Sequence, residues 1–260
     1  NLEYNFRVLI DEMKVRGYSR RTIKVYEYIN KTFLAKIRKS PKDITKKDIN
    51  DYLVSLYDKN KASATRHLIC SALKFYYETV LKRRFQLKHP KKSNKLPIVL
   101  GKEEIVSMIN ALPNPKHRLL IKLMYGSGLR VGEARKVKIE DFDAERKVLF
   151  VRGGKGDKDR IVNLSDKFIS DFTRFAKGKG GYLFEPSARP GKHICERTAQ
   201  NIVKNAAKRA DIGKKAHPHT LRTSYATHLI ENGVDISYVQ KLLGHSKIST
   251  TQGYIRLSQS

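Results

Sequence analysis

Residues 82–95 read Lys-Arg-Arg-Phe-Gln-Leu-Lys-His-Pro-Lys-Lys-Ser-Asn-Lys, and this stretch divides the chain. It holds seven basic residues and no acidic one, and Pro90, followed by Pro97, interrupts any helix. An ordinary solvated loop is the simpler interpretation, but a cationic stretch between two domains is well placed to neutralise phosphates. We therefore expect a first domain over residues 1–88, a basic linker over 89–100 and a second domain over 101–260.

The residues before this stretch show the spacing of short amphipathic helices. Ser19 can cap a first helix, Thr45 followed by Asp48 opens a second, and Ser63 opens a third. The positions expected on their inner faces are Ile23, Tyr26, Ile29, Phe33 and Ile37, then Ile49, Leu53 and Leu56, then Leu68, Ala72, Phe75 and Thr79. With no internal repeat and no strand-like alternation, the region is predicted to form a small helical bundle.

The residues after the stretch combine helices with one hairpin. Helical periodicity covers residues 103–112 and 117–125, and returns over 198–210, 221–231 and 235–243. Between these groups, residues 147–152 and 160–164 have the character of strands, and the turn that joins them contains Gly-Gly-Lys-Gly. The predicted fold class is therefore mainly α: an N-terminal helical bundle and a mostly helical C-terminal domain with a small antiparallel β-sheet.

Composition limits the partner more than the chemistry. The 260 residues include 54 Lys and Arg against 25 Asp and Glu, a formal charge of +29, for which nucleic acid is the obvious partner. A Lys-rich solvated surface or a ribosome-associated protein would show the same charge. Cys70 and Cys195 stand alone, so neither a disulfide framework nor a structural zinc site is expected. We expect a cytoplasmic protein without a membrane span or signal peptide.

Individually, the candidate chemical residues have simple explanations. Arg130 and Glu133, three apart on a helix, could form an ordinary surface ion pair. His219 and Arg222, however, would share one face at a helix start opened by Pro218, where both could donate to one phosphate oxygen. His217 is left without a role. His245, directly after Gly244, could be a satisfied loop histidine or a site residue.

Taken in order, these residues resemble a known family. The series Arg130, Lys155, the His-Thr-Leu-Arg box at 219–222, the Leu-Gly-His box at 243–245 and Tyr254 is similar to the tyrosine recombinase/integrase family. Residues 125–134 (YGSGLRVGEA) and 152–160 (RGGKGDKDR) most resemble its Xer-type branch in bacteria and archaea, as do 221–229 (LRTSYATHL) and 242–254 (LLGHSKISTTQGY). The resemblance spans nearly the whole chain, including the helical core-binding domain, the basic linker and the catalytic domain.

The resemblance implies a site-specific DNA recombinase that works through a 3′-phosphotyrosyl intermediate and a Holliday junction, without ATP, metal or cofactor. Tyr254 would be the nucleophile, and Arg130 and Arg222 would stabilise the pentavalent phosphorane. His219 would act as general base or proton relay, and His245 would donate a hydrogen bond to the phosphate. Lys155 is preferred to Lys158 as the general acid. Glu133 would support Arg130 without contacting DNA.

The resemblance also implies partners. We expect double-stranded DNA and self-assembly on it as a dimer or tetramer, with no membrane and no small-molecule substrate. Six basic residues of the central stretch are expected to bind DNA: Lys82, Arg83, Arg84, Lys91, Lys92 and Lys95.

The sequence departs from the family pattern at three points. Thr223 stands where a histidine is frequent, Gly253 precedes the nucleophile, and only six residues follow Tyr254. The C-terminal helix that docks on a neighbouring subunit in the family is therefore expected to be shortened or cut away. Chromosome dimer resolution, which we favour, and integration, excision or inversion stay open. A type IB topoisomerase-like activity and a non-catalytic DNA-binding role are the alternatives.

Overall fold

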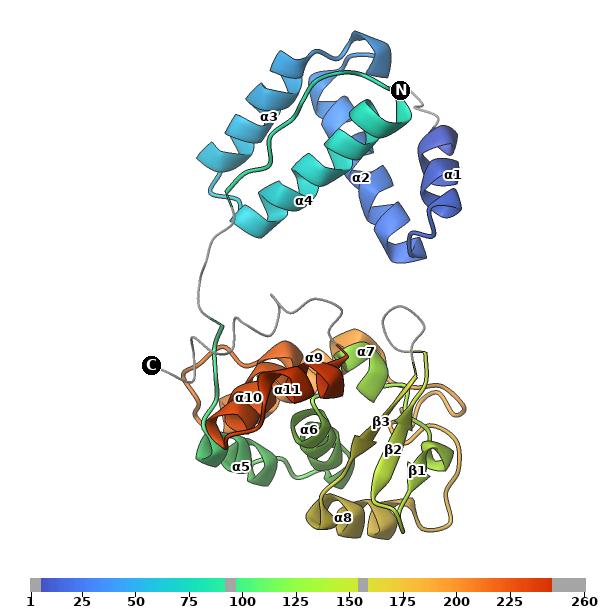
Figure 1. Ribbon diagram of the computed structural model, residues 1–260, viewed down its shortest axis with the longest axis vertical. Helices are drawn as coiled ribbons and strands as arrows, with labels where there is room; N and C mark the ends of the chain where they lie inside the picture. Colours follow the sequence, from blue (N-terminus) through green and yellow to red (C-terminus); the bar gives the residue numbers. More distant parts are fainter. Residues whose placement is uncertain (1–5, 92–96, 154–158, 245–260) are drawn as a thin grey trace. The chain divides into compact units, whose positions relative to one another are not determined.

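The computed structural model describes residues 6–91, 97–153 and 159–244, and the chain divides into two units, Asn1–Lys95 and Leu96–Ser260 (Figure 1). Each unit has its own apolar core. Both units are mostly helical, and the described strands all lie in unit 2, so the predicted mainly α fold class is confirmed. Within these ranges, none of the helices combines the length and apolarity that crossing a bilayer requires.

Unit 1 is a bundle whose helices begin where local side chains cap them. The side chain of Ser19 accepts from the N–H of Thr22 at 3.1 Å, and Thr45 and Asp48 form a reciprocal capping box. Both predicted helix starts are confirmed. Leu68, expected on the inner face, is instead 42% exposed. The elements are α1 (Arg7–Val15), α2 (Arg20–Ile37), the 3₁₀ turn η1 (Pro41–Asp43), α3 (Lys46–Asp58), α4 (Ser63–Lys74) and the π-helix η2 (Phe75–Val80).

The first part of the basic stretch is held on unit 1. Leu87 is buried in the unit 1 core, and Phe85 packs against that core. The hydrogen bonds that hold the segment run from Arg83 to the carbonyls of Lys42 and Ile44, from Leu87 N–H to Glu78, and from Ser63 to the carbonyl of Lys91. Residues 82–91 therefore belong to unit 1, and these include the start of the linker expected over residues 89–100, because apolar side chains inside the basic stretch anchor it.

Unit 2 combines a group of packed helices with a three-stranded antiparallel sheet of order β1-β2-β3, which lies at one side of them (Figure 1). Leu149 pairs with Val162 on the buried face, while Phe150 and Ile161 pair on the outer face. The predicted hairpin is confirmed, whereas β1 was not predicted. The elements are α5 (Lys102–Asn110), α6 (Pro115–Ser127), α7 (Val131–Ala134), the 3₁₀ turn η3 (Ile139–Asp141), β1 (Phe142–Asp143), β2 (Val148–Val151), β3 (Arg160–Asn163), α8 (Asp166–Ala176), α9 (Glu196–Arg209), α10 (Pro218–Glu231) and α11 (Ile236–Leu243).

Helix α10 is the central helix of unit 2 and carries two of the candidate residues. It contacts α6, α9 and α11, and residues on all its faces are buried between positions 218 and 228 (Figure 1). Some of the polar side chains buried there have hydrogen-bond partners, whereas Thr227 Oγ1 has none among the described residues. Ser224 donates to the carbonyl of Thr220 at 2.9 Å and accepts from the N–H of Leu100 at 2.9 Å. The helix thus holds its side chains in a fixed interior position.

We expect Gly128→Ala to lower the free energy of unfolding by about 2–4 kcal/mol, from left-handed strain and overpacking together. Gly128 ends α6 at φ +59°, and an added Cβ would lie 2.6 Å from Tyr225 Cδ1 and 2.7 Å from Leu243 Cδ2. The measurement is urea unfolding. Gly126→Ala is the matched control, because nothing lies within 4 Å of its added Cβ inside α6, and we expect it to stabilise slightly. Equal stability of the two variants would contradict the packing argument.

Candidate active site

Arg130 and Glu133 make a closer pair than a surface salt bridge. Arg130 is the N-cap residue of α7, and its backbone N–H donates to Glu133 Oε2 at 3.0 Å. Its Nη1 donates to Glu133 Oε1 at 2.9 Å. The Glu133 side chain is only 8% exposed, against 27% for Arg130. The Glu133 carboxylate therefore orients the partly exposed guanidinium of Arg130, through the contact that the sequence predicted for Glu133.

A second arginine, Arg160, also binds Glu133, and the sequence analysis did not identify it. It begins β3, and its guanidinium donates to both oxygens of Glu133, Nη2 to Oε2 at 2.7 Å and Nη1 to Oε1 at 3.2 Å. Its side chain is 14% exposed. A cation at the base of the predicted hairpin was visible in the sequence, but no pattern connected it to a carboxylate 27 positions away.

The Glu133 carboxylate stays ionised at the centre of this arrangement. Burial by itself would raise the pKa of Glu133. Hydrogen bonds from Arg160 and from the backbone and side chain of Arg130, with the positive charge of Arg160, outweigh burial and lower the pKa to about 2. The site therefore contains a permanent negative charge held between two guanidinium groups.

This lowered pKa predicts a pH-dependent contribution to stability. The folded pKa of Glu133 lies below its ordinary value of 4.5, so the stabilisation is complete above pH 4.5 and is lost as the pH falls toward 2. The shift corresponds to about 3 kcal/mol at neutral pH. In urea unfolding, wild type should exceed Glu133→Gln most at pH 7, and the difference should shrink steadily toward pH 3. A difference that does not change with pH would argue against this role.

Arg222 lies deep in unit 2 and is only 2% exposed. Its Nη1 donates to the carbonyl of Gly128 and its Nη2 to the carbonyl of Leu243, both at 2.6 Å. Gly128 caps the C-terminus of α6 and Leu243 is the last residue of α11, where unpaired carbonyls carry partial negative charge. The sequence analysis expected Arg222 to share one helix face with His219, where both could donate to a phosphate oxygen. In the structure the Arg222 guanidinium is buried between the ends of two helices.

A single corner of the chain, residues 243–244, brings the arginines together. Arg130 Nη2 donates to the carbonyl of Gly244 at 3.0 Å, and Arg222 binds the preceding carbonyl. Arg160 Cδ lies 3.7 Å from the position of a Cβ on Gly244. We call Arg130, Arg160 and Arg222, with Glu133, the arginine cluster. His245 follows this corner directly in the chain.

His219, near the start of α10, lies within the field of the same arginines. It keeps access to solvent, yet protein atoms crowd its ring. This partial desolvation, followed by the positive charges of Arg222, His217 and Arg130, lowers the pKa of His219 below its usual 6.5. A neutral imidazole can accept a proton at physiological pH.

His217, left without a role by the sequence, caps helix α10. Its Nδ1 accepts from the N–H of Thr220 at 3.2 Å. Its ring also lies parallel to that of His219, with the ring centroids 6.3 Å apart. The capping contact gives a structural role to a histidine that the sequence analysis left unassigned.

Several predicted residues fall outside the described residues. These are Lys155 and its rival Lys158, His245, Tyr254, Lys92 and Lys95. Among the other expected DNA contacts, Lys82, Arg83 and Arg84 line an open cleft of about 470 Å³ on unit 1 with Glu78 and Gln86, and Lys91 is exposed. Arg83 also donates to unit 1 carbonyls, so part of its role is structural. Across residues 6–91, 97–153 and 159–244, no group of three or more His, Cys, Asp or Glu side chains is placed to hold a metal ion.

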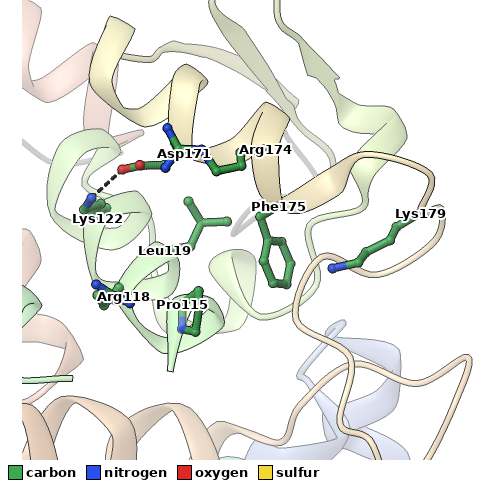
Figure 2. Close-up of a pocket in the computed structure, with 8 residues that line it drawn as sticks. All are labelled: Pro115, Arg118, Leu119, Lys122, Asp171, Arg174, Phe175 and Lys179. Carbon is green, nitrogen blue, oxygen red and sulfur yellow. Dashed lines mark hydrogen bonds and ion pairs between the residues drawn. The ribbon is translucent and has the colours of Figure 1, made fainter. Parts of the chain in front are cut away.

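Figure 2 shows a separate pocket of about 380 Å³ in unit 2, formed mainly by α6 and α8. Lys122 and Asp171 form an ion pair across it, and Lys179 Nζ lies 3.7 Å from the ring centroid of Phe175. None of the candidate residues lines this pocket. Among the described candidate residues, those that the structure brings together lie in the arginine cluster and not in this pocket.

Comparison with known proteins identifies the family of the chain. Residues 99–260 match the phage integrase family, and residues 6–87 match its N-terminal SAM-like domain. The tyrosine recombinase XerA of Pyrococcus furiosus is 36% identical over 254 residues, which cover 95% of this chain and 87% of that protein.

Two solved structures extend the match. A crystal structure of XerA recombinase is 30% identical, with a TM-score of 0.57, and the match covers 96% of this chain and 92% of that one. XerH recombinase bound to a palindromic difH substrate is 25% identical, with a TM-score of 0.73, covering 95% and 79%. From the two matched domains and these relatives, the chain belongs to the phage integrase family of tyrosine recombinases, enzymes that cleave and rejoin DNA.

Proposed function

We propose that this chain carries out Xer-type recombination with Tyr254 as its nucleophile. The Tyr254 oxygen attacks a backbone phosphorus of double-stranded DNA, forming a 3′-phosphotyrosyl bond as the bond to the 5′-oxygen breaks. Attack by a 5′-hydroxyl from a second duplex then releases the tyrosine and joins a recombinant strand, through a Holliday junction. The phosphotyrosyl bond conserves the energy of the broken linkage, so no ATP is needed.

The observation that carries this proposal is the convergence of Arg130 and Arg222 on one chain corner. Their guanidinium groups bind the consecutive carbonyls of Gly244 and Leu243, which supports a common position for both charges. Glu133 holds Arg130, and Arg160 in turn holds Glu133. Fixed cations of this kind stabilise the negative charge that develops on a phosphorane, because no reorganisation is needed when the reaction occurs. His245, next in sequence, would add a donor to the same phosphate.

Two residues are assigned to proton transfer, one for the attacking oxygen of Tyr254 and one for the leaving 5′-oxygen. His219, neutral because its pKa is lowered, takes the phenolic proton of Tyr254. Lys155, in the segment between β2 and β3, gives a proton to the leaving 5′-oxygen. These assignments require no metal ion or cofactor, since the charges come from side chains.

The same proposal covers the partners of the protein. A formal charge of +29 and the cationic cleft of Lys82, Arg83 and Arg84 favour binding to phosphate backbones. Lys91, Lys92 and Lys95, which follow in the sequence, are proposed as further DNA contacts. The related XerH was solved on its DNA substrate. We propose that copies of this chain assemble on DNA as a dimer that pairs into a tetramer. Among the possible outcomes we favour resolution of chromosome dimers, because the XerA relative matches both domains over 95% of this chain.

Covalent trapping tests the proposal directly. The protein is incubated with nicked suicide fragments of its host genome, in which the cleaved strand loses a short 5′-hydroxyl piece and cannot be rejoined. Denaturant-resistant adducts are sequenced, and mass spectrometry locates the attached nucleotide on the protein. Adducts at a defined site on the peptide containing Tyr254 are expected. DNA binding without adducts would instead favour the non-catalytic DNA-binding alternative.

A plasmid bearing two copies of the trapped site then separates recombination from topoisomerase activity. Recombinant circles are the expected product. Relaxed plasmid without exchange would favour the type IB topoisomerase-like alternative.

A further inference from the structure

We propose that Arg160 is a positioning residue for strand cleavage. It keeps Arg130 and the corner at residues 243–244 in one arrangement, next to the segment that joins β2 and β3. The inference rests on the proposed function, because it assigns Arg160 a part in presenting Arg130 to the scissile phosphate. Arg160 itself is not placed in contact with DNA, and it acts through the groups that it touches.

The first support is the geometry of the Glu133 carboxylate. Arg160 approaches it with two donors, at 2.7 and 3.2 Å, while Arg130 uses one side-chain donor and its backbone N–H. Two guanidinium groups and one backbone amide thus fix both carboxylate oxygens. Because a bidentate arginine contact fixes orientation as well as distance, Arg160 defines the plane in which Glu133 meets Arg130.

The second support is the contact with the corner. Arg160 Cδ lies 3.7 Å, and Nε and Nη1 each 3.8 Å, from the position of a Cβ on Gly244. The carbonyl of the same glycine accepts from Arg130 Nη2 at 3.0 Å. Arg160 therefore packs against the residue to which Arg130 is bonded, as well as against the carboxylate that orients Arg130. A glycine at this position allows the approach.

The third support is the place of Arg160 in the hairpin. It pairs with Val151 at the end of the β2–β3 ladder next to the segment that connects the two strands, and that segment contains Lys155. Asp159, next to Arg160, accepts from the N–H of Gly153 at 2.8 Å and closes the base of that segment. Arg160 is thus the link between the hairpin that carries the proposed general acid and the helix α7 that carries Arg130.

Burial makes this link sensitive to substitution. Arg160 and Glu133 are 14% and 8% exposed, so water cannot readily replace either partner. Without Arg160, one carboxylate oxygen loses its shortest hydrogen bond, and Arg130 becomes the only described guanidinium that holds Glu133. The guanidinium of Arg130 is then expected to sample several orientations.

The test measures single-turnover cleavage of the trapped site at saturating DNA, together with DNA affinity and melting temperature. Arg160→Met should slow cleavage by roughly 10- to 100-fold with nearly unchanged DNA affinity, the usual size for loss of a supporting contact. Arg160→Lys should recover part of the rate, because a single ammonium can still reach one oxygen. Arg146→Met is the matched control, since Arg146 is 81% exposed in the turn between β1 and β2, and its side chain pairs only loosely with Asp143 at 3.8 Å.

A double variant tests the proposed route through Glu133. If Arg160 acts through that carboxylate, adding Arg160→Met to Glu133→Gln should slow cleavage little further. Wild-type cleavage by Arg160→Met at normal melting temperature, or a multiplicative loss in the double variant, would overturn the inference. If Arg160→Met does not fold, Arg160→Lys must still show a rate loss without an affinity loss. Absence of adducts from wild type would instead reject the proposed function itself.

Discussion

Tyr254→Phe is expected to abolish covalent attachment to DNA, lowering cleavage by at least roughly 10⁴-fold, as removal of a nucleophile generally does. Phenylalanine keeps the ring and removes the oxygen that bonds to phosphorus. DNA affinity should stay nearly unchanged, because the cationic surface of the protein is untouched. The adduct is measured on denaturing gels with the nicked suicide substrate, and affinity by mobility shift on the intact site.

The matched control for this substitution is Tyr238→Phe. Tyr238 lies on α11, is 51% exposed, and loses the same hydroxyl. It should form adducts at the wild-type rate. Adducts from Tyr254→Phe at wild-type yield would show that another residue is the nucleophile, and would remove the centre of the proposed mechanism.

Arg222→Lys is expected to lower the cleavage rate by roughly 10³-fold, within the range seen when a charged transition-state donor is lost. The buried guanidinium joins the carbonyls of Gly128 and Leu243 at 2.6 Å. An ammonium cannot span both in the same plane, so either a carbonyl loses its donor or the charge moves away from the phosphate. Single-turnover cleavage should therefore fall much further than DNA affinity.

Stability has to be separated from chemistry for this variant. Loss of one buried hydrogen bond to a charged donor costs about 1.5–3 kcal/mol, so the melting temperature should also fall. Cleavage is therefore compared well below the transition of the variant. Arg209→Lys, an exposed position in the last turn of α9, is the control for an arginine-to-lysine change and should cleave normally. Cleavage by Arg222→Lys within a few fold of wild type would reject its assigned role.

Helices α2 and α3 could be predicted because side chains close in sequence cap their first turns. Ser19 and Thr45 cap α2 and α3 through residues three positions away, within reach of sequence patterns. Helix α8 was not predicted, although Ser165 caps it locally by accepting from the N–H of Phe168, and its side chains Phe168 and Phe172 are buried. They stack on Phe142 of β1, with centroids 4.2 Å apart for Phe142 and Phe172. That contact joins two elements distant in the chain, and β1 is too short to show a period of its own.

For the candidate site, sequence order identified residue types but not their surroundings. Arg130 and Glu133 were paired correctly because they are three positions apart. The burial of Arg222 was not foreseen, because the acceptors that hold it are backbone carbonyls, which leave no mark on side-chain patterns. Arg160 was missed for a related reason: its partner, Glu133, is fixed only when the hairpin packs beside α7. Contacts between residues far apart in the sequence could therefore be identified only from the structure.

The corner at residues 243–244 has a consequence for how this protein can evolve. Because Arg130 and Arg222 bind consecutive carbonyls there, a substitution that tilts α11 alters both contacts at once. Mutations in α11, in either arginine and at Gly244 should then be strongly epistatic, with the first one masking the harm of the next. During selection for a new DNA target, the effects of mutations around this corner should depend strongly on one another. Mutations in unit 1, whose core is separate, should combine more independently.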